Sequence, residues 1–251
     1  MIETMMKTQI DRLNTGIDGL DVLMTGGLIR GSVTLVTGKT GTGKTAFSTS
    51  FLHAGALKNE PGVYVTAEEG EEFIKKDVQA MFGWNLDDFE KRGLIKFLSI
   101  KPKFPGKVVT GEDLARYIKL YIFDLIEKIE NTVKQSKAIR LVIDSVSIIE
   151  MFIKDEYLCR VAMIQLMDRL RELGVTSVLT GTIPEASEAL SGGGIVEFIA
   201  DAIIKLDFTP VAEEFKRTLT IRKMRRTDHS IYIHPFDITK TGLKIIEVQK
   251  I

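Results

Sequence analysis

One stretch of the chain combines glycine, lysine and threonine in a spacing that binds phosphate. Residues 38–45 read GKTGTGKT, which fits the phosphate-binding pattern G-x-x-x-x-G-K-[ST]. Its glycines let the backbone turn tightly, so that successive N–H groups can face one anion. Lys44 would bring a positive charge to the β- and γ-phosphates, and the Thr45 hydroxyl would ligate Mg²⁺. The residues predicted to contact the nucleotide here are Gly38, Thr40, Gly41, Thr42, Gly43, Lys44, Thr45 and Ala46.

The segments on both sides of this loop are those that its mechanism requires. An apolar, β-branched run at 33–37 predicts a buried strand before the loop, and AFSTSFLHAGALK at 46–58 predicts a helix after it. The start of that helix would add the positive end of its dipole to the phosphate site. A simple glycine- and threonine-rich turn between strand and helix explains the spacing less well. The loop therefore predicts binding of a nucleoside triphosphate, with ATP and Mg²⁺ as the expected ligands.

Three acidic residues could supply the rest of an ATPase site. Asp144 ends the apolar run LVID, where a carboxylate could hold Mg²⁺ directly or through water, although this pattern also fits a strand-end cap. Glu68 and Glu69 end the predicted strand 63–67, and either could act as the catalytic base. Neighbouring residues of a strand point to opposite sides, which leaves one facing the γ-phosphate. A solvated acidic turn that opens the helix at 70 explains the pair equally well.

Polar side chains on two later strands have roles that the residues alone leave open. Thr180 lies near the end of the predicted strand 175–181, where its hydroxyl could contact the γ-phosphate or satisfy a buried backbone group. A basic cluster spans 216–226, and within a strand Lys223 and Arg225 would share a face and could reach one phosphate group. The cluster also fits a solvated edge strand or a nucleic-acid patch.

The composition is that of an ordinary globular protein. The 251 residues include 34 basic and 34 acidic side chains, so no global charge attracts nucleic acid or an anionic membrane. No apolar run approaches the roughly 20 residues of a membrane span, and the amino terminus has no signal-peptide core, which predicts a cytoplasmic protein without membrane contact. The single cysteine, Cys159, fits a reducing compartment. The histidines lack the spacing of a metal site.

Strand and helix patterns alternate along most of the chain. Buried strands are predicted at 33–37, 63–67, 94–100, 138–145, 175–181 and 202–207, helices at 46–58, 71–83, 112–136 and 156–173, and further strands at 217–224, 230–236 and 242–248. This order predicts an α/β fold, with a mostly parallel twisted sheet, helices on both faces and an antiparallel carboxyl-terminal extension. Without a linker or repeat, residues 1–251 are expected to form one domain, with an amino-terminal segment 1–14, a core 15–207 and terminal strands 208–251.

Several of these pieces together resemble one family. The KaiC-type domains of the RecA ATPase superfamily are similar to TGIDGLDVLMTGGLIRGSVTLVTGKTGTGKT at 15–45, YVTAEE at 64–69, LVIDS at 141–145 and the tail KMRRTDHS with HPFDITKTGLKI. The resemblance implies a RecA-like core that binds ATP at subunit interfaces, usually in a hexameric ring. It further implies that Asp144 is the magnesium-side carboxylate and that Glu68 and Glu69 are the catalytic pair. Lys223 and Arg225 would form a K-x-R finger that reaches the neighbour's γ-phosphate.

Two functions fit this resemblance. One is an oligomeric regulatory or signalling ATPase, and the other is a RadA-paralogue, recombinase-like protein that binds single-stranded DNA. The loops that contact DNA in recombinases correspond to 147–157 and 184–194, whose charges are mostly acidic, whereas single-strand binding requires a positive groove with stacking aromatics. The ATPase is therefore preferred. The clock proteins carry two such domains and a phosphorylation segment without a clear counterpart here, so autokinase activity is not expected.

Overall fold

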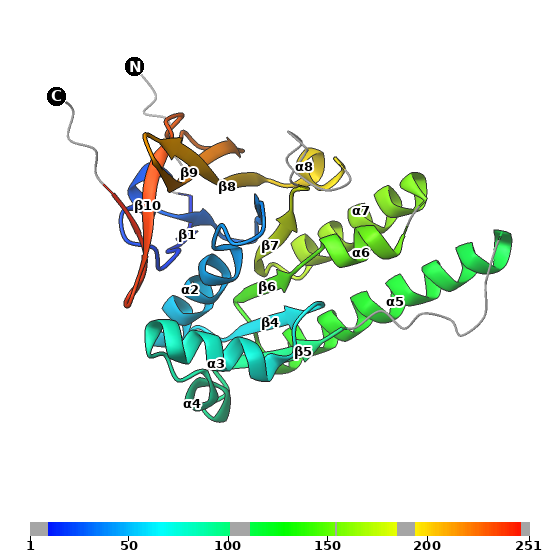
Figure 1. The fold of residues 1–251 in the computed structure, drawn as a ribbon. Coiled ribbons are helices and arrows are strands. Elements are labelled where there is room, and N and C mark those ends of the chain that lie inside the picture. Colours follow the sequence, from blue (N-terminus) through cyan, green and yellow to red (C-terminus); the bar gives the residue numbers. More distant parts are fainter. Residues whose placement is uncertain (1–9, 101–110, 154, 185–193, 247–251) are drawn as a thin grey trace, which may run out of the picture.

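A nine-stranded sheet forms the centre of the protein (Figure 1). The computed structural model describes residues 10–100, 111–153, 155–184 and 194–246. In spatial order the strands are β11 (Gly242–Ile245), β10 (His234–Thr239), β9 (Glu214–Met224), β8 (Ala202–Val211), β3 (Val33–Gly38), β7 (Thr176–Thr182), β6 (Arg140–Asp144), β4 (Gly62–Thr66) and β5 (Ile95–Ser99). A separate small sheet pairs β1 (Arg12–Leu13) with β2 (Leu28–Ile29).

The direction of the strands divides the large sheet into two parts. From β8 to β5 every neighbouring pair is parallel, whereas from β8 to β11 every pair is antiparallel. This arrangement confirms the predicted α/β class with its antiparallel carboxyl-terminal extension. In a parallel sheet the carboxyl ends of the strands meet at one edge, and ligands bind beyond that edge.

Helices cover both faces of the parallel part (Figure 1). Their bounds are α1 (Leu20–Leu23), α2 (Lys44–Leu57), α3 (Glu71–Phe82), α4 (Leu86–Lys91), α5 (Gly111–Ser136), α6 (Ser147–Phe152), α7 (Glu156–Glu172) and α8 (Val196–Ile199). Alternate strand residues point to opposite faces, so Tyr64 and Val142 pack in the hydrophobic cluster beside α2. Val65 and Ile143 pack in the second cluster, beside α5 and α7. The sheet thus lies between two separate hydrophobic cores.

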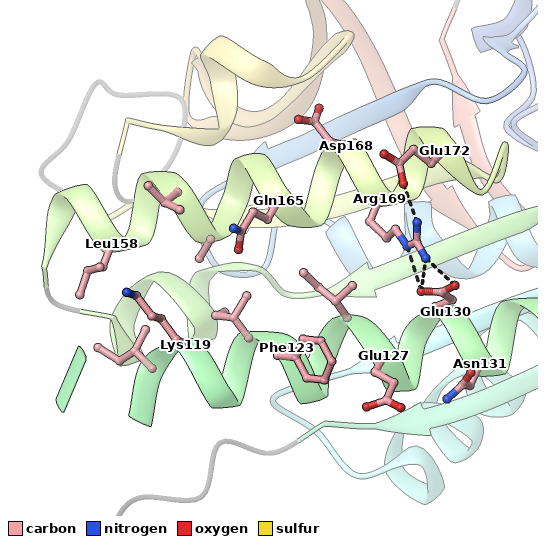
Figure 2. A pocket seen from close by; sticks show the side chains of 15 residues that line it. Lys119, Phe123, Glu127, Glu130, Asn131, Leu158, Gln165, Asp168, Arg169 and Glu172 are labelled. Atoms are coloured by element: carbon pink, nitrogen blue, oxygen red, sulfur yellow. Dashed lines mark hydrogen bonds and ion pairs between the residues drawn. The ribbon is translucent and has the colours of Figure 1, made fainter. Parts of the chain in front are cut away.

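The long helix α5 has the apolar spacing of a helix that covers a sheet. Its buried side chains recur every three or four residues, at Ile118, Ile122, Leu125, Ile129 and Val133. Polar contacts then join α5 to α7 at the surface. The Arg169 guanidinium donates to Glu130 of α5 at 2.6–2.9 Å and to Glu172 of its own helix at 2.6 Å (Figure 2).

Several parts of the secondary structure differ from the sequence prediction. Helix α4 was not predicted; it is short and begins at Asn85, whose side chain accepts from the Asp88 N–H. Helix α6 occupies the start of the stretch 147–157 that we expected to be a loop. The strand predicted at 230–236 begins only at His234, because residues 231–233, although apolar, are exposed and pair with no neighbouring strand. Alternating apolar residues therefore misled the prediction here.

The antiparallel strands return toward the start of α2. A β-carbon at Gly43, the residue before α2, would lie 3.1 Å from the Ile238 side chain of β10. Gly242 of β11 similarly faces the Trp84 ring, where a β-carbon would lie 3.3 Å away. The carboxyl-terminal strands thus form one wall of the region around the glycine-rich loop. Within the described ranges no helix combines the length and the apolar character needed to cross a lipid bilayer.

Candidate active site

The glycine-rich loop opens onto a cavity of about 390 Å³ at the carboxyl ends of the parallel strands. The residues that line it come from the loop and α2, from the turn after β4, from α3, from the ends of β6 and β7, and from β9 and β10. They are Thr40, Gly41, Gly43, Lys44, Thr45, Ala46, Thr49, Glu68, Glu69, Asp77, Val78, Met81, Phe82, Asp144, Ser145, Thr182, Arg217 and Ile238. Most of the predicted site residues thus share one cavity.

The loop itself has the shape that phosphate binding requires. Gly38 ends β3 so close to β8 that a β-carbon would lie 2.4 Å from the Leu206 backbone oxygen. Gly43 has φ 107°, in the region that favours glycine, and it precedes the first turn of α2 without a side-chain cap. The first N–H groups of a helix have no partners within the helix. The start of α2 therefore presents backbone donors and positive dipole to an anion.

The Lys44 side chain folds back, and its ammonium group contacts the loop that precedes it. Its Nζ donates to the Gly38 carbonyl oxygen at 2.8 Å and to the Lys39 carbonyl oxygen at 2.9 Å. Burial lowers the pKa of Lys44, while the nearby charges of Asp144 and Glu68 oppose that shift. A phosphate at this position would favour the charged form in the same way.

The Asp144 carboxylate, at the end of β6, is the centre of a network of hydroxyl groups. Its Oδ2 accepts from Thr45 Oγ1 at 3.0 Å and from the Tyr64 hydroxyl at 2.5 Å. Its Oδ1 accepts from Thr180 Oγ1. The pKa of Tyr64 is raised well above its ordinary value by burial first and by Asp144 second. Strands β4, β6 and β7 are neighbours in the sheet, and this order brings the hydroxyls of Tyr64 and Thr180 to one carboxylate.

Thr180 has a different contact from either of the two that we expected. Its side chain is fully buried, and its hydroxyl donates to Asp144 instead of to a backbone group. Thr182, two residues further along β7, lines the cavity, and its N–H donates to the Ser147 hydroxyl at 2.8 Å. Of these two threonines, Thr182 is the one at the cavity wall.

Glu68 and Glu69 both line the cavity, and which of them faces the γ-phosphate stays a prediction. Strand β4 ends at Thr66, so the pair lies in the bend after the strand, where side chains need not alternate. Glu68 Oε1 accepts from the Ser145 hydroxyl, beside Asp144. Burial raises the pKa of Glu69, and the charges of Asp144, Asp77 and Glu68 raise it further. Both carboxylates therefore lie within the acidic part of the cavity.

Lys223 and Arg225 lie away from this cavity, near the end of β9. Lys223 Nζ donates to the carbonyl oxygens of Glu197 and Phe198, each at 3.2 Å, and Arg225 Nη2 donates to the Phe198 carbonyl at 3.5 Å. The two cations thus cap the carboxyl end of α8, where helix carbonyls lack partners. The pKa of Lys223 is lowered by burial and by the charge of Arg225. Both side chains thus lie at the same helix end, and a contact of either with a phosphate group stays a prediction.

Several residues of the site were not predicted from the sequence. Ser145, Thr182, Arg217 and Ile238 line the cavity, and Tyr64 contacts it through Asp144. Arg217 belonged to the recognised basic cluster, and its guanidinium lies 5.3 Å from the Phe208 ring centre. Tyr64 and Ile238 look in the sequence like ordinary strand residues. Only the order of the strands in the sheet reveals their position.

The oxygen atoms around Thr45 and Asp144 fit a magnesium ion that is bound mainly by phosphate and water. Mg²⁺ prefers oxygen ligands and usually takes one or two from the protein when it binds with a nucleotide. The Thr45 hydroxyl and Asp144 Oδ2 lie 3.0 Å apart beside the loop and would supply such ligands. The described residues contain no cluster of three or more His, Cys, Asp or Glu side chains suited to a metal held by protein alone.

The family model for the ATPase KaiC matches residues 13–250. The chain belongs to the KaiC family of ATPases. Among relatives of this KaiC-family chain, a UPF0273 protein of Thermotoga maritima is 38% identical over 94% of the chain and 96% of the relative. The circadian clock protein KaiC3 of Synechocystis is 37% identical over 96% of the chain, which spans 47% of that relative. A solved KaiC-like protein of Pyrococcus horikoshii is 36% identical, with a TM-score of 0.81 over 95% of this chain and 100% of the other.

A second, larger hollow lies between α5 and α7, on the face of the sheet opposite α2. It has a volume of about 880 Å³, and the residues that line it include Phe123 and Glu127 of α5 and Gln165 and Asp168 of α7 (Figure 2). Its floor is apolar, and it contains none of the predicted site residues. This groove lacks the phosphate-binding backbone and the acidic cluster that the smaller cavity has, so its size does not make it the active site.

Proposed function

We propose that this KaiC-family chain binds ATP and hydrolyses it with the help of Mg²⁺. The observation that carries the proposal is that the glycine-rich loop, Asp144 and the Glu68–Glu69 pair line one cavity of about 390 Å³. These are the three kinds of group that ATP hydrolysis needs: a phosphate cradle, a carboxylate on the metal side and a group that orients water.

Each group has a defined task in the proposed reaction. Loop N–H groups and Lys44 bind the β- and γ-phosphates and hold them against the start of α2. Thr45 and Asp144 would hold Mg²⁺, which when bound neutralises charge that develops on the phosphates. Glu68 or Glu69 orients the attacking water and accepts its proton. The carboxyl-terminal wall with Arg217 and Ile238 encloses the rest of the nucleotide.

Substitution of Lys44 tests this proposal most directly. Among the described residues Lys44 is the only lysine that lines the cavity, so we expect turnover of Lys44→Ala to fall by about 100-fold or more, the size of effect seen when one transition-state donor is removed. Nucleotide affinity, measured with a fluorescent ADP analogue, should fall with it. Lys39→Ala provides a matched control in the same loop, because Lys39 does not line the cavity. Turnover that persists in Lys44→Ala contradicts the assignment of the loop.

We also propose that the active form is a homo-oligomer, most simply a hexameric ring, with nucleotide bound between subunits. Lys223 and Arg225 lie together on the surface but outside the chain's own cavity, which supports a role for them at a neighbour's nucleotide. Light scattering with and without ATP and Mg²⁺ should then show a larger mass with nucleotide. Mixing Lys223→Ala with Lys44→Ala subunits should restore part of the activity, because each supplies what the other lacks. Activity strictly absent from every mixture contradicts a trans-acting finger.

DNA binding stays the alternative that this proposal disfavours. Helix α6 replaces the first of the two expected DNA loops, and Glu150 is its only charged residue. Most of the second loop, 185–193, and Lys154 of the first lie outside the described residues. A labelled single-stranded oligonucleotide distinguishes the two functions, because tight binding with a steep dependence on salt would favour the recombinase-like function. A single domain and a cytoplasmic location stay predictions from composition.

A further inference from the structure

Tyr64 is a buried aromatic residue of β4 whose hydroxyl reaches the active site from inside the protein. Its side chain is 1% exposed, and its ring stacks on Phe97 of β5 with ring centres 5.4 Å apart. The hydroxyl donates to Asp144 Oδ2 at 2.5 Å. In the sheet Thr66 pairs with Asp144, so Tyr64 lies two residues earlier on the neighbouring strand. The ring therefore leans along β4 toward the carboxyl ends of the strands.

A phenylalanine would fill the same space without a polar group to satisfy. Burying a hydroxyl is unfavourable unless it is hydrogen-bonded, so Tyr64 contributes something that packing alone does not require. Its ring already has an apolar environment, in the hydrophobic cluster beside α2. Among the described residues, its hydroxyl bonds to the carboxylate on the proposed metal side of the site.

The hydroxyl contacts limit what Asp144 can still bind. An ionised carboxylate offers about four acceptor positions, two on each oxygen. Oδ2 accepts from Thr45 and Tyr64, which fills its two positions. Oδ1 accepts from Thr180, which leaves one position on that oxygen. Because donors from three separate elements hold the carboxylate, it cannot rotate freely.

We infer that Tyr64 is a positioning residue, which acts through Asp144 to fix the one carboxylate oxygen that serves the magnesium ion of the nucleotide complex. This inference rests on the proposed ATPase function. Without the Tyr64 hydroxyl, Oδ2 has a free acceptor position and the carboxylate can turn, so its alignment with the metal is lost. Partners of this kind, one step behind the ligands, typically change metal affinity or activity by about 10–100-fold when they are mutated.

The test compares Tyr64→Phe with Tyr121→Phe. Both changes remove one hydroxyl from a tyrosine, but Tyr121 belongs to α5 on the opposite face of the sheet and does not line the cavity. The readout is the affinity for a fluorescent ADP analogue, measured once with Mg²⁺ and once with EDTA. In Tyr64→Phe we expect about a tenfold loss of the Mg²⁺-dependent gain in affinity, with the affinity in EDTA within about twofold of wild type. In Tyr121→Phe both values should stay unchanged.

The same experiment separates failure of this inference from failure of the proposed function. If wild-type protein binds no nucleotide, the proposed function is wrong. If wild type binds ADP and Mg²⁺ strengthens that binding equally in wild type and Tyr64→Phe, the inference is wrong. Equal losses in Mg²⁺ and in EDTA also overturn it, because they indicate a role in packing only. In turnover assays the expected signature is a higher Mg²⁺ requirement, with most of the rate recovered at saturating Mg²⁺.

A second measurement keeps the inference testable if Tyr64→Phe does not fold. Wild-type protein labelled with 3-fluorotyrosine carries a fluorine reporter on each of its 5 tyrosines. Adding Mg²⁺ to the ADP complex should shift one ¹⁹F resonance, that of the tyrosine bonded to Asp144. If every resonance is unaffected by Mg²⁺, the hydroxyl does not sense the metal side of the site and the inference is overturned.

Discussion

The two ends of strand β6 carry charged residues whose surroundings are opposite in kind. At the start of the strand, the fully buried Arg140 donates five hydrogen bonds of 2.6–2.9 Å, to Glu60, the Asn14 side chain and the backbone oxygens of Asn14 and Phe51. At the end of the strand, Asp144 lines a cavity and shares it with Glu68 and Glu69. At the start of the strand Glu60 neutralises the charge of Arg140. At the end of the strand Asp144 lies in one cavity with two other carboxylates.

Along this single strand, one end stabilises the fold and the other end lies at the candidate active site. Arg140 ties the amino-terminal segment at Asn14 to the turn at Glu60, and its side chain is fitted so closely that a β-carbon on Gly55 would lie 2.4 Å from its Cδ. The acidic cluster at the other end becomes favourable only with a cation present, since like charges nearby repel. Residues selected for binding a ligand often make the unliganded protein less stable than other residues at the same positions would.

Arg140→Ala should therefore have the largest effect on stability. Removing one partner of a buried ion pair costs about 3–5 kcal/mol, because the other charge remains buried and unpaired. Here Glu60 would lose its partner, and the backbone oxygens of Asn14 and Phe51 would lose donors. Denaturant unfolding should show a large fall in the midpoint. Lys128→Ala, which breaks an exposed pair with Asp124, is the control and should cost about 0.5 kcal/mol or less.

Asp144→Asn should reverse this pattern, with a large loss of activity and little loss of stability. The change removes the negative charge on the metal side, so we expect turnover to fall by about 100-fold or more, which corresponds to roughly 2.7 kcal/mol of transition-state stabilisation. The amide oxygen still accepts from Thr45 and Tyr64, its NH₂ group can donate to the Thr180 hydroxyl, and repulsion with Glu68 and Glu69 is relieved, so the free energy of unfolding should fall by less than about 1 kcal/mol. An unfolding midpoint lowered as far as in Arg140→Ala would contradict the comparison.

The candidate-site residue at the end of β6, Asp144, could be predicted from the sequence far better than the contacts of Arg140 at its start. The loop at 38–45 carries its chemistry in consecutive residues, and Asp144 follows a short apolar run, so both are visible as local patterns. Arg140 gave no such signal. Its partners Asn14, Phe51 and Glu60 lie between 80 and 126 residues away, and only the folded sheet brings them together.

Side-chain contacts between neighbouring strands could not be predicted from the sequence for the same reason. Tyr64 and Thr180 reach Asp144 because β4 and β7 flank β6, an order that does not follow the order of the strands in the sequence. The expectation that one of Glu68 and Glu69 faces the γ-phosphate rested on extending β4 by a few residues, which imposed an alternation that the bend does not have. The fold class depended only on the alternation of elements and was therefore predictable.

A third comparison distinguishes Glu68 from Glu69 as the base. Both Glu68→Gln and Glu69→Gln should keep ATP binding, and at least one should lose most of its turnover, by about 10²–10⁴-fold. A carboxylate base is active when deprotonated, so turnover falls as the pH drops below its pKa. The pKa of Glu69 is raised above its ordinary value by burial and by the nearby carboxylates. If Glu69 is the base, the wild-type acidic limb lies above the range of an ordinary glutamate.

The pH profile of Glu69→Gln then decides between the two residues. If Glu69 is the base, the variant loses turnover and the acidic limb that belonged to Glu69 disappears. If Glu68 is the base, turnover persists in Glu69→Gln and is lost in Glu68→Gln. Normal turnover and an unmoved profile in both variants would remove the pair from the mechanism. The acidic end of β6 would then bind the metal and nucleotide without supplying the base.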